Sequence, residues 1–251
     1  MEPTGPKRSQ SEADFARELR EKKRLLASLL VHDLRSPLAG IQGCLELLRG
    51  ELESAHDVSA QAQWYLDDAS KLVERTLGLV ATILDVDELE EGILRVAPMP
   101  VRMAELIERT RTSIRAHYEV RGLRFEASCP PDLTVTLDPE LFERIFENLL
   151  DNAARFAPRG GRCTLAVLRD AAGVEIAVGN NGPPVPVAER ERIFGRFYQV
   201  EARRAAARAN RGLGLYFCKL AVEAHGGAIH VEQRGDLGTV FVIRLPESRQ
   251  P

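Results

Sequence analysis

Cysteine is scarce in this sequence. The four cysteines, Cys44, Cys129, Cys163 and Cys218, lie far apart, and none belongs to a CxxC motif. A disulfide framework or a zinc site needs paired or regularly spaced cysteines. We therefore expect neither, and we expect the cysteines to be reduced, buried thiols.

Long hydrophobic runs are missing as well. No apolar run approaches the roughly 18 residues that a membrane-spanning helix needs. The N-terminal stretch MEPTGPKRSQSEADFARELREKKRLL is polar and charged, so it lacks the apolar segment of a secretory signal peptide. These two absences predict a cytoplasmic protein without a membrane span.

Neither acidic nor basic residues are in large excess. The 251 residues include 34 Lys and Arg against 37 Asp and Glu, a net charge of −3. Nucleic-acid binding normally requires a basic surplus, so no nucleic-acid partner is expected. Apolar residues make up 44% of the chain, which is enough for the core of one large domain or two small ones.

The N-terminal third has the apolar spacing of helices. Residues 1–12 are rich in Pro, Ser, Gly and charge and are predicted to be disordered. Residues 13–94 predict a helical hairpin with a break near residues 51–58. Because one hairpin cannot cover both of its apolar faces, a homodimer forming a four-helix bundle is expected. The predicted seam of the second helix consists of Leu66, Ala69, Val73, Leu77, Val80 and Leu84.

Residues 95–248 alternate between helical and strand-like patterns. Helices are predicted at 103–117, from 139 onward and at 213–225. Strands are predicted at 124–127, 133–137, 163–168, 174–178, 228–233 and 239–245. This order fits an α+β sandwich, a mixed sheet with helices on one face. The chain is thus predicted to be multidomain, with an all-α hairpin followed by an α+β domain.

One histidine lies on the polar face of the first predicted helix. A period of 3.6 residues puts His32 of VHDLRSPLAG opposite the apolar Leu30, Leu34 and Ile41 on the same helix. Pro37 cannot donate to the carbonyl one turn before it, which loosens the helix beside the histidine. Taken alone, His32 is more often a surface histidine than a nucleophile.

Two asparagines and three glycine-rich loops point to a nucleotide. Asn148 and Asn152 in FENLLDNAARFAP share a helix face, and neutral amide oxygens suit a Mg²⁺ ion that already carries phosphates. VGNNGPPVP, from Val178, and GDLGTVF, from Gly235, are predicted loops whose backbone can come close to a flat ligand. NRGLGLYFCK, from Asn210, precedes a helix whose N-terminal amides can hold phosphate. Each signal is weak by itself.

In this order the segments resemble the sensor histidine kinases of two-component systems. HDLRSP resembles the family's H box, ENLLDNAARF the N box, VGNNGPPVP the G1 box, IFGRFYQ the F box and NRGLGLYFCK the G2 box. The resemblance covers about residues 12 to 248. It implies a HisKA-type dimerisation and phosphotransfer hairpin over residues 13–94 and a Bergerat-fold ATP-binding domain over residues 95–248.

The resemblance also implies roles for individual residues. His32 would accept the γ-phosphoryl group of ATP, and Asp33 would take the ring proton or fix the tautomer. Asn148 and Asn152 would hold Mg²⁺ together with ATP. The other implied nucleotide-binding residues are Arg155, Phe156, Asn180, Gly182, Arg211, Gly212, Leu213, Gly214, Leu215 and Thr239. The implied partners are a second copy of the chain, the receiver domain of a response regulator and an upstream sensory protein.

The chain departs from the family pattern in the G1 box. Asn180 stands where the family has an aspartate that accepts the adenine amino hydrogen bond, and Pro184 replaces a glycine. Asn180 can still accept through its side-chain oxygen. These changes leave an alternative open, a dimeric pseudokinase that acts as an ATP-binding scaffold. A serine kinase on the same ATP domain is disfavoured, because the H box is intact.

Overall fold

The structure is a computed structural model that describes residues 34, 37, 39–41, 43–48, 50, 60–92, 94–198 and 212–247. Among the predicted site residues, His32, Asp33 and Arg211 lie outside the described residues. The chain divides into two compact units, Met1–Ala81 and Thr82–Pro251. The last residues of a long helix group with the second unit. The domain boundary expected near residue 94 stays a prediction.

The first unit is helical on both sides of the predicted break. Residues 39–41 and 43–48 are helical, and helix α2 spans Ala60–Glu90. Within this unit, a Cβ built on Gly40 would lie 2.9 Å from Leu72 Cδ1, so the two helical segments approach closely there. No helix of the described part of the chain is long and apolar enough to cross a bilayer.

The predicted seam of α2 is only partly covered. Of its predicted members, Ala69 is buried, whereas Leu66 and Val73 are 40% and 41% exposed. The side chains of Leu77, Val80 and Leu84 lie outside those that the structure describes. Two residues of the predicted seam, Leu66 and Val73, are therefore left exposed in a single chain.

The second unit is built on a five-stranded mixed sheet of order β2-β4-β5-β7-β6. Its strands are β2 (Arg124–Ser128), β4 (Arg162–Asp170), β5 (Gly173–Asn180), β6 (Ala228–Arg234) and β7 (Leu237–Pro246). β2 runs parallel to β4, and the other neighbouring pairs are antiparallel. Two short strands, β1 (Met99–Arg102) and β3 (Thr134–Leu137), form a separate antiparallel pair; β1 was not predicted.

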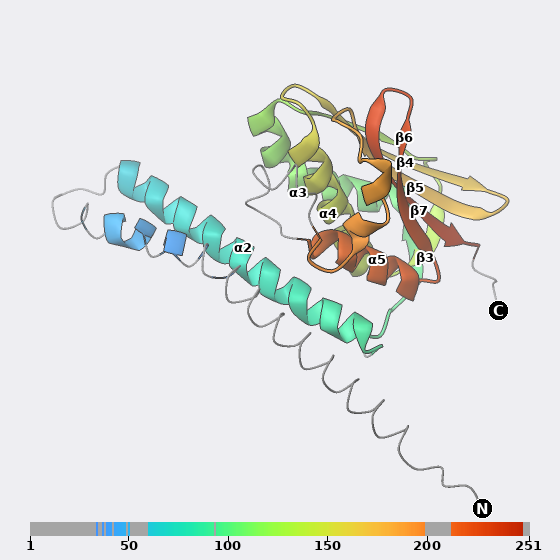
Figure 1. The fold of residues 1–251 in the computed structure, drawn as a ribbon, viewed down its shortest axis with the longest axis horizontal. Coiled ribbons are helices and arrows are strands. Elements are labelled where there is room, and N and C mark those ends of the chain that lie inside the picture. The colour runs from blue at the N-terminus through green and yellow to red at the C-terminus, as the bar shows by residue number, and fades with distance from the viewer. Residues whose placement is uncertain are drawn as a thin grey trace, which may run out of the picture. The chain divides into compact units, whose positions relative to one another are not determined.

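Three helices cover one face of the five-stranded sheet (Figure 1). They are α3 (Met103–Arg121), α4 (Pro139–Phe156) and α5 (Gly214–Ala224), and two 3₁₀ turns, η1 (Val187–Glu189) and η2 (Arg192–Phe194), precede α5. Phe142, Phe146 and Leu149 of α4 and Ile176 and Phe241 of the sheet are almost fully buried between the two layers. The predicted α+β sandwich is confirmed.

Helix α4 is held at both ends. At its start, Asp138 accepts hydrogen bonds from the N–H groups of Glu140 at 3.0 Å and Leu141 at 3.1 Å, which is a strong N-cap. At its end, the Arg121 guanidinium donates to the carbonyl oxygens of Ala154 at 2.5 Å and Ala157 at 3.1 Å. Asn148 and Asn152 therefore lie on a helix whose two ends are both fixed by hydrogen bonds.

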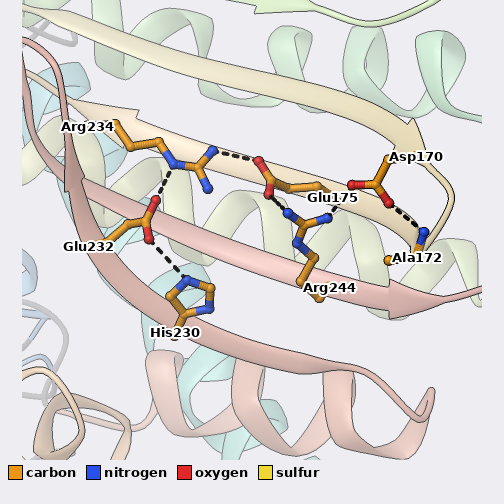
Figure 2. Close-up of polar contacts among 7 residues, drawn as sticks. All are labelled: Asp170, Ala172, Glu175, His230, Glu232, Arg234 and Arg244. Carbon is orange, nitrogen blue, oxygen red and sulfur yellow. Dashed lines mark hydrogen bonds and ion pairs between the residues drawn. The ribbon is translucent and has the colours of Figure 1, made fainter.

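A charged network covers the face of the sheet that the helices leave free (Figure 2). The nearly buried Glu175 carboxylate on β5 accepts from Arg234 of β6 and Arg244 of β7, each at 2.5 Å. Arg244 also bonds Asp170 at 2.8 Å, and Arg234 bonds Glu232. The Arg234 guanidinium in particular lowers the pKa of Glu175 below its ordinary value. The network ties four strands together on this face.

All four cysteines are free thiols. Cys163 and Cys218 are buried as predicted, but the prediction was wrong for Cys44 and Cys129, which are only half-buried. Burial raises the pKa of the Cys163 thiol above its ordinary value. Such thiols stay protonated and unreactive near neutral pH.

Candidate nucleotide-binding and phosphotransfer site

The Asn148 side chain is oriented by its own helix. Its Nδ2 donates to the carbonyl oxygen of Arg144 at 2.8 Å, which leaves Oδ1 on the other side of the amide. A Cβ built on Gly214 would lie 2.5 Å from that Oδ1. The amide oxygen of Asn148 thus lies against the first residue of α5, and Asn152 follows one turn later on α4, half-buried.

The start of α5 is a helix N-terminus, a feature that can bind an anion. Leu213 occupies the N-cap position, and no side chain among the described residues caps the helix. The first N–H groups of a helix have no partner within it, and together with the helix dipole they favour a phosphate. Leu213 is buried and Leu215 packs against the core, so both leucines anchor this turn of α5.

Gly212 joins the start of α5 to the predicted F box. Its φ is +79°, and a Cβ there would lie 2.6 Å from the carbonyl carbon of Phe197. The Phe197 N–H in turn donates to the Gly212 carbonyl oxygen at 3.1 Å. Phe197 is the one non-glycine residue with positive φ in the described ranges, at 60°. The two segments are therefore held together through their backbones.

The other end of the site lies where β5 and β7 meet the G1 loop. Asn180 ends β5 directly opposite Thr239 of β7, and both are buried. Asn180 Oδ1 accepts from the Gly182 N–H at 2.8 Å. The Thr239 hydroxyl donates to the carbonyl oxygen of Pro183 at 2.9 Å. Among the described residues, Asn180 Nδ2 has no hydrogen-bond partner although it is buried.

Gly182 packs against the end of α4. A Cβ on Gly182 would collide with the carbonyl oxygen of Phe156, and a Cβ on Gly238 would collide with the carbonyl oxygen of Gly182. Phe156 lies two turns after Asn148, about 12 Å along the helix axis. α4 therefore connects the two ends of the predicted site, the asparagines with Gly214 at one end and the G1 loop at the other.

Arg155 was expected to reach the phosphates. Its side chain is 15% exposed and bonds the Asp151 carboxylate at 2.8 Å. A phosphate contact would have to compete with this ion pair. That role for Arg155 stays a prediction.

One cluster beside the site was missed by sequence reasoning. The last residues of α2 belong to the second unit, where Val86 is fully buried in its core. Arg196 bonds Asp87 at 2.9 Å and Glu90 at 2.6 Å. The Tyr216 hydroxyl also donates to Glu90; burial and this contact raise the pKa of Tyr216 to about 12. The available signal was the acidic run DVDELEE, which needs basic partners.

Two sequence profiles match the chain in the predicted order. The family described as "His Kinase A (phospho-acceptor) domain" matches residues 22–92. The family described as "Histidine kinase-, DNA gyrase B-, and HSP90-like ATPase" matches residues 137–249. The chain belongs to the sensor histidine kinase family. His32 falls within the first match, and all the predicted nucleotide-binding residues fall within the second.

Individual relatives agree with this assignment. "Adaptive-response sensory kinase SasA" of Synechococcus sp. (strain JA-3-3Ab) is 32% identical over 242 residues, which cover 96% of this chain and 63% of that protein. "Signal transduction histidine-protein kinase BaeS" of Escherichia coli (strain K12) is 29% identical over 222 residues, 87% of this chain and 45% of that protein. The chain thus spans less than two thirds of the length of these curated relatives.

Solved structures show the same folds. The histidine kinase ShkA, solved at full length in complex with AMPPNP, covers 89% of this chain with a TM-score of 0.64 at 25% identity, and 45% of its own length is matched. The catalytic domain of the histidine kinase ThkA covers 60% of this chain and 97% of itself, with a TM-score of 0.53 at 25% identity.

Proposed function

We propose that the chain is a protein-histidine kinase that uses a nucleoside triphosphate, ATP in its family, to phosphorylate His32. The observation that carries the proposal is the Asn148 amide oxygen against Gly214 at the uncapped start of α5. This arrangement joins an oxygen ligand for a cation to a set of N–H donors for phosphate. The phospho-acceptor family match over residues 22–92 supports His32 as the acceptor.

The described residues fit Mg²⁺ at one end of the site. Asn148 and Asn152 would hold the ion through neutral oxygens, which add no negative charge beside the phosphates. Mg²⁺ supplies charge neutralisation during phosphoryl transfer. The N–H groups at the start of α5 orient the phosphate oxygens, and the Gly212–Phe197 contact holds that start in place.

His32 attacks the γ-phosphorus as a neutral imidazole. A nitrogen–phosphorus bond forms while the bond from phosphorus to the ADP oxygen breaks. Asp33 takes the ring proton or fixes the tautomer that leaves the attacking nitrogen unprotonated. The phosphoryl group then passes to an aspartate on the receiver domain of a response regulator.

A second copy of the chain is part of this proposal. The partly exposed Leu66 and Val73 of α2 leave an apolar stripe that a homodimeric four-helix bundle would cover. An upstream sensory protein and a cytoplasmic location stay predictions. No observation on the described residues favours the pseudokinase scaffold.

The test is phosphorylation of the purified chain with γ-labelled ATP and Mg²⁺. We expect a label that is labile in acid and stable in base, absent from His32→Ala and Asn152→Ala and retained by His230→Ala. His230 is a suitable control because it is 52% exposed on the far face of the sheet. A label that survives His32→Ala would refute the assignment, and nucleotide binding without any label would favour the scaffold.

A further inference from the structure

The Asn180 amide has a fixed orientation. The buried Gly182 N–H needs an acceptor, and Asn180 Oδ1 supplies it at 2.8 Å. A flipped amide would turn an NH₂ group against that N–H and leave the Gly182 donor without a partner, at a cost of about 1–3 kcal/mol. The hydrogen-bond network therefore assigns Nδ2 to the side turned away from Gly182.

The position that remains is a donor without an acceptor. Asn180 is 0% exposed, and its Nδ2 finds no partner in the part of the chain that the structure describes. Buried polar atoms in folded proteins almost always have a partner. An acceptor brought by a ligand would satisfy Nδ2.

The Thr239 hydroxyl beside it offers the opposite polarity. A hydroxyl has one proton to donate, and Thr239 gives it to the carbonyl oxygen of Pro183 at 2.9 Å. Its lone pairs remain available to accept. Thr239 and Asn180 are directly paired across the β5–β7 ladder, so their Cβ atoms lie roughly 5 Å apart. Together the pair presents a donor next to an acceptor.

Purine bases differ in this pattern at position 6 and N1. Adenine has an amino donor at position 6 and an acceptor at N1, whereas guanine and hypoxanthine have an oxygen acceptor at position 6 and an N1–H donor. A 6-oxopurine thus complements Asn180 Nδ2 and the Thr239 oxygen at both positions. Adenine would place its amino group against the Asn180 NH₂ group.

We propose that Asn180 and Thr239 make the base end of this site selective for 6-oxopurine nucleotides over adenine nucleotides. The inference rests on the proposed function and changes only the preferred base. The phosphate end, around Asn148 and Gly214, does not contact the base and binds the triphosphate of either nucleotide. ATP therefore still binds, but without its base hydrogen bond to residue 180.

The test is calorimetric binding of Mg²⁺ complexes of ATP, ITP and GTP to the full chain and to Asn180→Asp. ITP is the decisive probe because its base, hypoxanthine, lacks the 2-amino group of guanine. We expect wild type to bind ITP at least about tenfold more tightly than ATP, and Asn180→Asp to reverse that ratio, because a carboxylate can accept from Gly182 and from an adenine amino group. Asn181→Asp is the matched control: it changes the same group one residue later on an exposed side chain, and its ratio should equal that of wild type.

Thr239→Val supplies a second measurement. Loss of the hydroxyl should weaken ITP binding more than ATP binding, whereas a purely structural role would weaken both equally. ATP binding as tight as ITP binding or tighter in wild type overturns the base assignment, whatever the ratio in Asn180→Asp, and leaves the kinase proposal intact. Failure of all three nucleotides to bind wild type overturns the proposed function, and the base assignment with it.

Discussion

Gly212 and Phe197 touch through their backbones, and this contact fixes the start of α5, where the proposed site would hold phosphate. A Cβ on Gly212 would lie 2.6 Å from the Phe197 carbonyl carbon, and Gly212 also has a φ of +79°. Gly212→Ala should therefore destabilise the second unit by about 2 kcal/mol or more, because strain at positive φ adds to the steric clash. It should also weaken nucleotide binding, since the start of α5 shifts. Urea unfolding and calorimetric binding measure the two effects.

Gly235→Ala is the control for that substitution. Gly235 also has positive φ, +53°, but a Cβ there meets nothing within 4 Å. It should show the backbone strain alone, about 1 kcal/mol, with nucleotide binding unchanged. Equal effects of the two substitutions on stability and binding would show that contact with Phe197 does not matter.

Most elements of the second unit could be predicted, because their apolar residues repeat with a clear period. The end of α3 was placed four residues early, at His117, although Gly122 gives the true signal: its φ of +63° forms the left-handed C-cap after Arg121. β1 was missed because it has only four residues, three of them exposed and one a proline. Such a strand exists through its pairing with β3, and pairing between distant segments leaves no local period.

The Glu175 network makes stability depend on pH. Arg234 above all, and also Arg244, lower the pKa of Glu175 below its ordinary value of 4.5, so the folded state releases this proton more readily than the unfolded state. The stabilisation is therefore fully present above about pH 5 and is lost as the pH falls below about 4.5. Glu175→Gln should cost roughly 1–2 kcal/mol at pH 7, and much less at pH 3. Urea unfolding between pH 3 and pH 7 measures this difference.

Glu119→Gln is the comparison for that experiment. Glu119 on α3 is 71% exposed and pairs only loosely with Arg115, at 3.8 Å. Exposed pairs contribute little to stability, so its pH profile should follow that of wild type. A Glu175→Gln profile parallel to that of wild type between pH 3 and pH 7 would mean that ionisation of Glu175 does not contribute to the pH dependence of stability.

The residues of the candidate site could be predicted from the sequence, but not which of their atoms are left to donate or accept a hydrogen bond. Asn148, Asn152 and the glycine loops stand in motifs with short internal spacing, so the sequence alone indicated them. The sequence also indicated that Asn180 could accept a hydrogen bond. Which of its atoms remains available depends on the backbone N–H of Gly182, which takes Oδ1. That choice follows from the turn geometry after β5, which no residue pattern encodes.

The exposed stripe on α2 predicts a dimer that two charges would break. Leu66 and Val73 lie seven residues apart, on one face of the helix, and both are about 40% exposed in the single chain. The double variant Leu66→Asp and Val73→Asp should sediment with the mass of one chain at concentrations where wild type has the mass of two. Lys71→Glu, on the opposite face of α2, should remain dimeric. A monomeric wild type at all concentrations would contradict the four-helix bundle.

The contacts of Arg196 predict how firmly the end of α2 is held. Arg196 and Glu90 are 106 residues apart in sequence, yet Arg196 binds both Glu90 and Asp87, and its side chain is 22% exposed. Ion pairs that solvent still reaches contribute about 1 kcal/mol at most, so Arg196→Gln should speed local opening about fivefold. The amides to follow are those of Glu91, Gly92 and Leu94, which donate to the carbonyl oxygens of Asp87, Leu89 and Glu88.

Hydrogen exchange followed by mass spectrometry measures this opening. Tyr216→Phe removes the second donor to Glu90 and should accelerate exchange at the same three amides to a smaller extent, because the ion pair with Arg196 remains. Lys219→Gln is the control, since Lys219 pairs at 3.8 Å with Glu223 within α5 and makes its ion pair away from α2. Exchange at these amides that is equal in wild type and Arg196→Gln would mean that the buried Val86, rather than the charges, holds the end of α2 in place.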